Sequence, residues 1–318
     1  MIRRLPVPLT VTFWLVLLLA PVVLDDWRIS QLSQLLTYGL FALSLSFIWG
    51  GAGILCFGQA IFFGVGAYLM GLVTLGKFPV LGDSQWTGIA LSIVGGGGAA
   101  FLLGLFLFGG RGLIGAHLAI VTLCAAVVAE VGAQRWDFLG GSNGLLGIPP
   151  LVAPFERDDP FLSSSETYFL VLGIVLLVYV LLLAIERSAL GTVLAAIRSN
   201  EDRTRFFGFG VRTAKLFAFS LSGMIAGLAG ALFTAQFGFV SPPLVGFGLS
   251  TEVLIWVAVG GREVLLAALV GAMLVRWVEN LLSDSFGQYW LLTMGVLFIV
   301  VVVIAPRGLF GRLLHLRT

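Results

Sequence analysis

The segment 186–215 has the sequence ERSALGTVLAAIRSNEDRTRFFGFGVRTAK and is the only long, strongly charged stretch of the chain. It holds six basic and three acidic residues, and apolar segments lie on both sides of it. Residues 191–207 are expected to form one short amphipathic helix, because Val193 and Ile197 fall four positions apart on the same face. Charge combined with an apolar face is typical of a contact surface, so we interpret this segment as a cytoplasmic loop that meets a soluble partner.

The composition around this segment indicates a membrane protein. Of the 318 residues, 59% are hydrophobic and only 11% are charged, and the mean hydropathy is +1.07. A soluble domain of this length carries far more charge on its surface. We therefore predict an all-α polytopic membrane protein with a single transmembrane domain over 1–318, because helices satisfy every backbone polar group inside lipid.

The apolar runs predict about ten transmembrane helices, at about 20 residues for each crossing. The first run follows two arginines and resembles a signal peptide, but it lacks a small-x-small cleavage site, so an uncleaved span is expected. The run 246–260 is short and ends in two glycines, which leaves a half-helix or a re-entrant segment open. The other expected spans are 31–49, 54–76, 88–108, 113–134, 168–185, 213–236, 264–282 and 289–305.

Basic residues outside these spans gather on the side of the segment 186–215. Because basic loops stay on the cytoplasmic side, this asymmetry predicts that the segment and both termini are cytoplasmic. The longest loop on the opposite side is 135–167, which is rich in Gly, Pro, Ser and acidic residues. Its composition predicts turns, and it serves either as a docking site for an external partner or as a passive connector.

Catalytic and metal-binding patterns are absent from the sequence. His117, His315, Cys56 and Cys124 are scattered through apolar or basic segments, so neither a disulfide nor a metal site is indicated. The chain contains no phosphate-binding glycine loop and no nucleophile motif. We expect a transport or binding function without catalysis, and no interaction with nucleic acid.

Ionisable residues inside the expected spans are few. Arg276 and Glu279 are three positions apart on one helix and are expected to pair, mainly in a structural role. Glu130 and Glu252 are expected near outer helix ends, where water reaches them. A proton- or sodium-driven pump needs a deeper acidic relay, so energy is expected to come from another subunit.

Glycines interrupt the apolar segment 50–72, GGAGILCFGQAIFFGVGAYLMGL. Close helix packing is the favoured interpretation of these glycines, and a discontinuous helix that lines a pathway is the alternative. Gln59 lies in the same segment, and its amide needs a partner in lipid. A small polar solute needs donors and acceptors to cross, so we expect pathway residues at Gln59, Thr122, Ser142, Asn143 and Gln236.

A series of motifs along nearly the whole chain resembles the membrane permease subunit of bacterial ABC importers for branched-chain (hydrophobic) amino acids. One departure is Gln59, where many members of that family have histidine after the glycine. No single motif is decisive, but their order is highly specific. The motifs are GILCFGQA at 53–60, GAHLAIVTL at 115–123, GGSNGLLGIP at 140–149, AIR at 196–198, AGLAGAL at 226–232 and PRGL at 306–309.

The resemblance implies a multi-subunit importer in the bacterial inner membrane. Its expected partners are a second, related permease, two ATPase subunits beneath and a periplasmic solute-binding protein above. ATP would be bound by the ATPases, and this chain would hold no cofactor. The ATPases would push a coupling helix at about 191–205 and drive alternating access. The expected coupling residues are Gly191, Ile197, Arg198, Glu201, Asp202, Arg205 and Gly208.

The resemblance also bears on the solute. The stretches RTRF at 203–206, IWVAVGGR at 255–262 and QYWL at 288–291 look closest to the urea and short-amide branch of the family. The stretch GLLGIP at 144–149 looks more like the amino-acid branch. We favour urea or short amides as the solute, with branched-chain or other hydrophobic amino acids as the alternative. A secondary transporter or a passive urea or amide channel is the alternative from another class.

Overall fold

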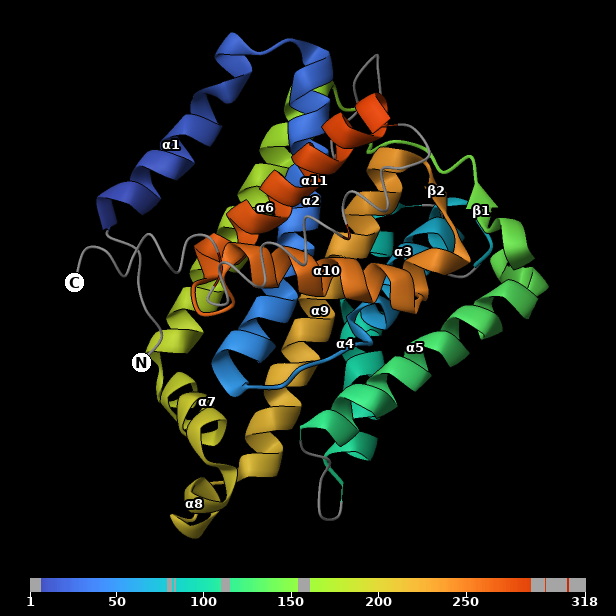
Figure 1. Ribbon diagram of the computed structural model, residues 1–318. Coiled ribbons are helices and arrows are strands. Elements are labelled where there is room, and N and C mark those ends of the chain that lie inside the picture. The colour runs from blue at the N-terminus through green and yellow to red at the C-terminus, as the bar shows by residue number, and fades with distance from the viewer. Residues whose placement is uncertain are drawn as a thin grey trace.

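A computed structural model describes residues 7–78, 82, 84–109, 115–153, 161–286, 295 and 308 of the chain. The described part is almost entirely helical, and the helices form a bundle (Figure 1). The long helices are α1 (Val7–Val23), α2 (Asp26–Ser46), α3 (Gln59–Thr74), α4 (Gln85–Leu107), α5 (Ala116–Arg135), α6 (Ser164–Arg187), α9 (Val211–Phe237), α10 (Phe247–Gly260) and α11 (Leu265–Phe286).

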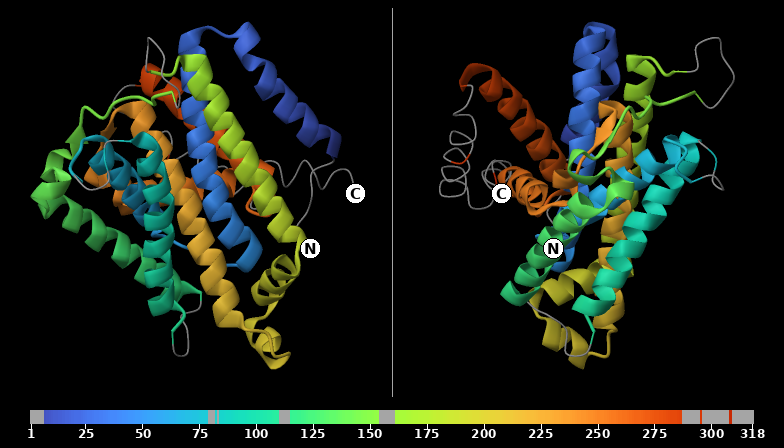
Figure 2. Two further views of the ribbon diagram at one scale, coloured as in Figure 1. Left: turned by 180° about the vertical axis from the view of Figure 1, so that it is seen from behind. Right: turned by 90° about the vertical axis from the view of Figure 1, so that its right-hand side faces the viewer.

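Short elements connect these helices. Two of them, α7 (Ala189–Ser199) and α8 (Glu201–Phe206), lie together at one end of the bundle (Figure 2). A π-helical turn, η1 (Phe47–Gly51), continues α2. The remaining short elements are the 3-10 turns η2 (Asp137–Leu139), η3 (Gly141–Asn143) and η4 (Pro242–Val245) and the strands β1 (Leu145–Leu146) and β2 (Phe239–Val240).

Six helices within the described residues are long and apolar enough to cross a membrane. They are α4, α5, α6, α9, the continuous helix formed by α2 and η1, and α11 counted to Leu282. The all-α polytopic fold predicted from the sequence is therefore confirmed. Helices α1, α3 and α10 match three further expected spans but are shorter. The expected span 289–305 lies outside the described residues.

Helices α3, α4 and α9 pack with their backbones in contact. A Cβ atom at Gly66 of α3 would overlap the carbonyl of Gly227 in α9, and one at Gly227 would overlap the carbonyl of Ser92 in α4. The Ser92 hydroxyl also donates a hydrogen bond of 2.7 Å to the carbonyl of Gly66. Small residues permit this close approach in lipid, where packing rather than hydrophobicity holds helices together. The packing interpretation of these glycines is confirmed.

The helix formed by α2 and η1 ends inside the protein. It stops at Gly51, residues 53–58 are not helical, and α3 begins at Gln59. Gly53 has a φ of 74°, a conformation that favours glycine. A Cβ atom at Gly50 would overlap the carbonyl of Arg262, so the break lies directly against the connection between α10 and α11. The segment 50–72 thus contains both a break and a tightly packed helix.

Helix α10 lies across α2 and α9 rather than beside them (Figure 1). It has 14 residues, which gives a length of about 21 Å at the α-helical rise. A full crossing needs about 30 Å. The half-helix interpretation of 246–260 fits this geometry. The loop after α5 has the expected turns, with positive φ at Gly140, Gly141, Gly144 and Gly147. Its pairing of β1 with β2, Leu145 opposite Val240, was not foreseen.

Candidate functional site

The charged segment forms two helices, and the prediction of one continuous helix over 191–207 is wrong. Asn200 lies between α7 and α8 with extended backbone angles, φ −163° and ψ 106°. Its side chain accepts a hydrogen bond of 2.9 Å from the backbone N–H of Arg203 and caps α8. An asparagine at this position competes with helical hydrogen bonds, which is why the helix restarts here. Gly208, with a φ of 84°, then follows α8.

Helix α7 attaches to the bundle through one face. Leu194 and Ile197 are buried there, which confirms the amphipathic pattern. Gly191 is also buried, and a Cβ atom at that position would overlap the carbonyl of Glu186 at the end of α6. The close turn from α6 into α7 therefore requires glycine, and it fixes the direction in which α7 leaves the bundle.

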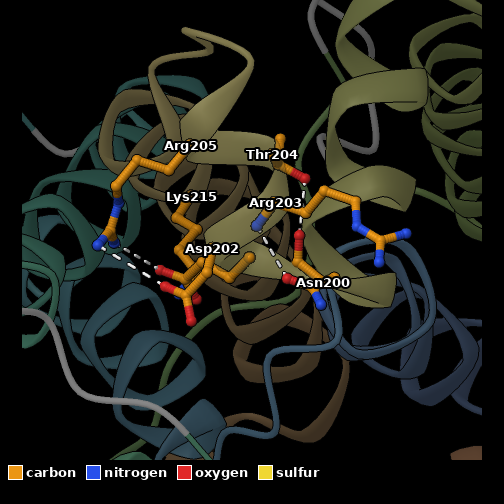
Figure 3. A network of polar contacts seen from close by, with 7 residues as sticks. Asn200, Asp202, Arg203, Thr204, Arg205 and Lys215 are labelled. Atoms are coloured by element: carbon orange, nitrogen blue, oxygen red, sulfur yellow. Dashed lines mark hydrogen bonds and ion pairs between the residues drawn. The ribbon is translucent and has the colours of Figure 1, made fainter.

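Helix α8 is locked to α9 by a network of charges (Figure 3). Lys215 of α9 is 5% exposed and donates a hydrogen bond of 2.5 Å to the Glu201 carboxylate. The same carboxylate accepts a hydrogen bond of 3.3 Å from Arg205. The Lys215 ammonium also lies 5.3 Å from the centre of the Phe108 ring. Asp202 is mostly exposed and reaches Arg205 only at 4.0 Å, which leaves its carboxylate available to a partner.

Arg198 joins α7 to two distant parts of the chain. Its guanidinium donates a hydrogen bond of 2.5 Å to the carbonyl of Gly50, where the helix formed by α2 and η1 ends. It also forms an ion pair of 2.7 Å with Glu263, in the connection between α10 and α11. The stem of the arginine packs against Gly53, where an added Cβ would lie 3.1 Å from it. One side chain therefore links the surface helix to the broken helix and to α10.

Three phenylalanines form an exposed aromatic tip after the charged network. Phe206, Phe207 and Phe209 are 91%, 76% and 51% exposed. None of the three was among the expected coupling residues. Large apolar side chains exposed in a row mark an interaction site rather than ordinary surface.

The expected pathway residues lie in separate places. Gln59 is fully buried, and its amide donates hydrogen bonds of 2.9 and 2.8 Å to the hydroxyls of Ser44 and Ser222. Its carbonyl oxygen has no partner within the described part of the chain. Thr122 is also buried, and its hydroxyl accepts a hydrogen bond of 3.0 Å from the backbone N–H of Phe57. Thr122 therefore holds the broken segment 53–58 in place, and Gln59 fixes the start of α3 directly after it.

The other three expected pathway residues are elsewhere. Gln236 of α9 is half-buried and donates a hydrogen bond of 2.8 Å to the Thr37 hydroxyl. Ser142 and Asn143 are exposed in η3. The described residues thus bring Gln59 and Thr122 to the same segment but do not join the five into one cluster.

Comparison with known proteins gives a family match over residues 28–304. The matching family is described as the branched-chain amino acid transport system / permease component. The chain belongs to this family. It is therefore a permease component, a transport subunit and not an enzyme, and it lies in the bacterial inner membrane as a multi-pass protein.

Individual relatives also support the assignment of this permease to the family. The high-affinity branched-chain amino acid transport system permease protein LivM of Escherichia coli strain K12 is 32% identical over 293 residues, 86% of this chain and 67% of the relative. LivM of Salmonella typhimurium is 32% identical over 310 residues, 91% of this chain and 71% of the relative. The permease protein BraD of Pseudomonas aeruginosa is 24% identical over 292 residues, 87% and 92% of the two chains. No solved structure matches the chain.

The permease also contains an ionic cluster that sequence analysis found only in part. The expected pair of Arg276 and Glu279 is confirmed at 2.7 Å. Arg276 also donates a hydrogen bond of 2.9 Å to the Tyr38 hydroxyl and lies 3.8 Å from Glu252. Its guanidinium stacks 4.2 Å from the centre of the Tyr38 ring. The cluster ties α2, α10 and α11 together, and Glu252 is an ion-pair partner rather than only a water-exposed acid.

Two further expectations concern single acidic and sulfur-containing residues. Glu130 is half-buried, and its carboxylate lies so close to Gly246, before α10, that a Cβ there would overlap it. A carboxylate at a helix start is favourable because of the helix dipole. Cys56 and Cys124 are both free thiols. Among the described residues no group of His, Cys, Asp and Glu is arranged to hold a metal ion.

Proposed function

We propose that this permease is a subunit of an ATP-driven importer that moves branched-chain amino acids across the inner membrane. The observation that carries the proposal is the similarity to LivM over 86% and 91% of the chain. Three short stretches of the sequence had favoured urea or short amides. Similarity over most of the chain outweighs them, because it rests on many more positions than three short stretches do.

The proposed importer has the partners that the family implies. Two ATPase subunits would bind ATP and dock on α7 and α8, a solute-binding protein would dock on the outer face, and a second permease would complete the pathway. The ATP would remain on the partners, and this chain would hold no cofactor. The exposed carboxylate of Asp202 and the aromatic tip of Phe206, Phe207 and Phe209 offer the ATPase both charge and apolar surface.

The coupling step follows from the contacts of Arg198 and Glu201. A push on α8 reaches α9 through the ion pair between Glu201 and Lys215. A push on α7 reaches the end of η1 and the start of α11 through Arg198. Because these segments border the break at 53–58, we expect a movement of α7 and α8 to change the geometry of that break. In the proposed alternating-access mechanism, these residues transmit the movement.

Uptake into proteoliposomes tests the solute. The assembled transporter, its binding protein and ATP should drive uptake of radiolabelled leucine, isoleucine and valine. Unlabelled leucine should compete, whereas excess urea or acetamide should not. Competition by urea or acetamide but not by leucine would instead establish the amide branch. Uptake of solute by this chain alone, without ATPases, would refute the importer and establish a channel or secondary transporter.

Two substitutions test the coupling surface. Glu201→Ala and Arg198→Ala should each strongly reduce ATP-dependent uptake without reducing the amount of protein in the membrane. Asp25→Ala is a control, because it removes an exposed carboxylate from the connection between α1 and α2, at the opposite end of the bundle from α7 (Figure 1). Normal uptake by both variants would contradict the assignment of α7 and α8 as the ATPase contact.

A further inference from the structure

A groove with a volume of about 590 Å³ lies between α3 and α5. Ile61, Val65 and Leu69 of α3 form one wall, and Ala129 and Gly132 of α5 form the opposite wall. It extends to the outer end of α5, where Arg135, Trp136 and the 3-10 turn η2 border it. Gly132 is exposed, and no atom lies within 4 Å of the place where its Cβ would stand, so the groove is open on this side.

The walls of the groove are apolar over most of their length. The Tyr68 hydroxyl is a polar exception: it is buried and has no hydrogen-bond partner within the described residues. The other charged or polar features lie at the rim. Arg135 and Trp136 are exposed there, and Lys77 lies 5.5 Å from the centre of the Phe138 ring and donates a hydrogen bond to the Phe138 carbonyl.

We propose that this groove binds an acyl chain of a phospholipid, with the lipid phosphate at Arg135 and Lys77. A long hydrocarbon chain needs an apolar wall and no polar partners along its length, which is what the groove provides. Arginine and tryptophan at the end of a membrane helix are typical of the headgroup level. A basic rim complements a phosphate.

The same walls disfavour a free amino acid as the occupant. The ammonium of a zwitterion needs an acidic or carbonyl partner when it leaves water, and the lining contains no carboxylate. Glu130, also on α5, directs its carboxylate to Gly246 instead. The volume is several times what a branched aliphatic side chain fills, and it falls in the range of sites that hold whole ligands. The proposed lipid site is therefore separate from the transport pathway, and it does not depend on which solute the permease transports.

Photo-crosslinking with a phosphatidylglycerol that carries a diazirine near the end of one acyl chain tests the proposal. The full transporter is reconstituted into vesicles of phosphatidylethanolamine and this probe, and labelled peptides are identified by mass spectrometry. Gly132→Leu fills the groove from an open position. Gly173→Leu is its matched control, because Gly173 is an exposed glycine on α6 that also has no atom within 4 Å of an added Cβ. Ala129→Leu replaces Gly132→Leu if that variant does not assemble.

The expected result is labelling of α3 and α5 that Gly132→Leu reduces at least fivefold and Gly173→Leu leaves unchanged. Arg135→Gln should reduce labelling by the phosphatidylglycerol probe several-fold and spare labelling by a diacylglycerol with the same photoactive chain. Three results would overturn the proposal. They are labelling that Gly132→Leu does not reduce, loss of labelling in excess leucine, and labelling that appears only when the second permease is removed.

Discussion

Arg198 is the residue whose loss should most directly disconnect the surface formed by α7 and α8 from the rest of the bundle. Three substitutions separate its contacts. Arg198→Ala removes both the hydrogen bond to Gly50 and the ion pair with Glu263. Glu263→Gln weakens the ion pair alone. Arg198→Lys keeps the charge but loses the planar fork that reaches two partners at once, so it should be intermediate.

The two contacts differ in strength because they differ in exposure. The Gly50 carbonyl is buried, and a hydrogen bond from a charged donor to such a group contributes about 1.5–3 kcal/mol. The side chains of Arg198 and Glu263 are 28% and 48% exposed, and an ion pair so open to solvent contributes about 0–1 kcal/mol. Arg198→Ala should therefore cost about 2–3 kcal/mol of linkage, and Glu263→Gln less than about 1 kcal/mol.

These free energies translate into transport rates at about tenfold for each 1.4 kcal/mol. If the linkage limits transport, Arg198→Ala should reduce ATP-dependent leucine uptake about 30- to 150-fold, and Glu263→Gln no more than about fivefold. The assay is the initial rate of uptake into proteoliposomes, expressed per ATP hydrolysed and per permease incorporated. Thermal unfolding of each variant in detergent shows whether a loss of uptake reflects coupling or folding.

Three outcomes would refute this reasoning. In one, Glu263→Gln is as damaging as Arg198→Ala, which would mean that the ion pair and not the Gly50 contact carries the linkage. In another, Arg198→Ala keeps normal uptake per ATP, which would remove α7 from the transmission path. A drop in uptake that exactly follows a drop in thermal stability would also show that Arg198 only holds the fold.

The remaining predictions concern the interior of the bundle. Gly227→Ala places a Cβ against the backbone of α4 and should destabilise the permease by about 1–3 kcal/mol in a thermal unfolding assay. Gly98→Ala is its control and should be near neutral, because an added Cβ there meets no atom within 4 Å. Gln59→Leu leaves two buried serine hydroxyls without their donor and should change the KM or the maximal rate of uptake; unchanged kinetics would remove it from the pathway. Arg276→Gln leaves two neighbouring carboxylates without their cation and should cost about 3–5 kcal/mol; an unfolding temperature like that of the wild type would contradict the cluster's structural role.

Much of the fold could be predicted from the pattern of apolar and polar residues along the sequence. Long apolar runs predict helices that cross a membrane, because lipid offers backbone groups no alternative partner. The breaks at Gly208 and between Gly51 and Gln59 coincide with glycines. The second matches the discontinuous helix that was the alternative interpretation of the segment 50–72. The break at Asn200 was not predicted. An asparagine within an amphipathic pattern fits the polar face of a helix as well as it fits a helix cap.

Such patterns do not predict the contacts of the candidate site. The charge of the segment 186–215 predicts a contact surface. Arg198 is assigned to that surface because it lies within the segment. Its partners Gly50 and Glu263 are 148 and 65 positions away, and no periodicity in the chain connects them. The same holds for Tyr38, which reaches Arg276 across 238 positions. Neither link is visible until the helices are placed.

The sequence by itself determined that this protein is a helical membrane permease, which side of it is charged, and which residues belong to that charged surface. It did so because lipid accepts apolar side chains and excludes charged ones, and this preference depends on each residue's own side chain. Only the tertiary structure decided that α10 lies across the bundle, that Arg198 joins the surface to the broken helix, and that α3 and α5 leave an apolar groove between them. Those features depend on how close two helices approach, and that distance is set by contacts between residues far apart in the chain.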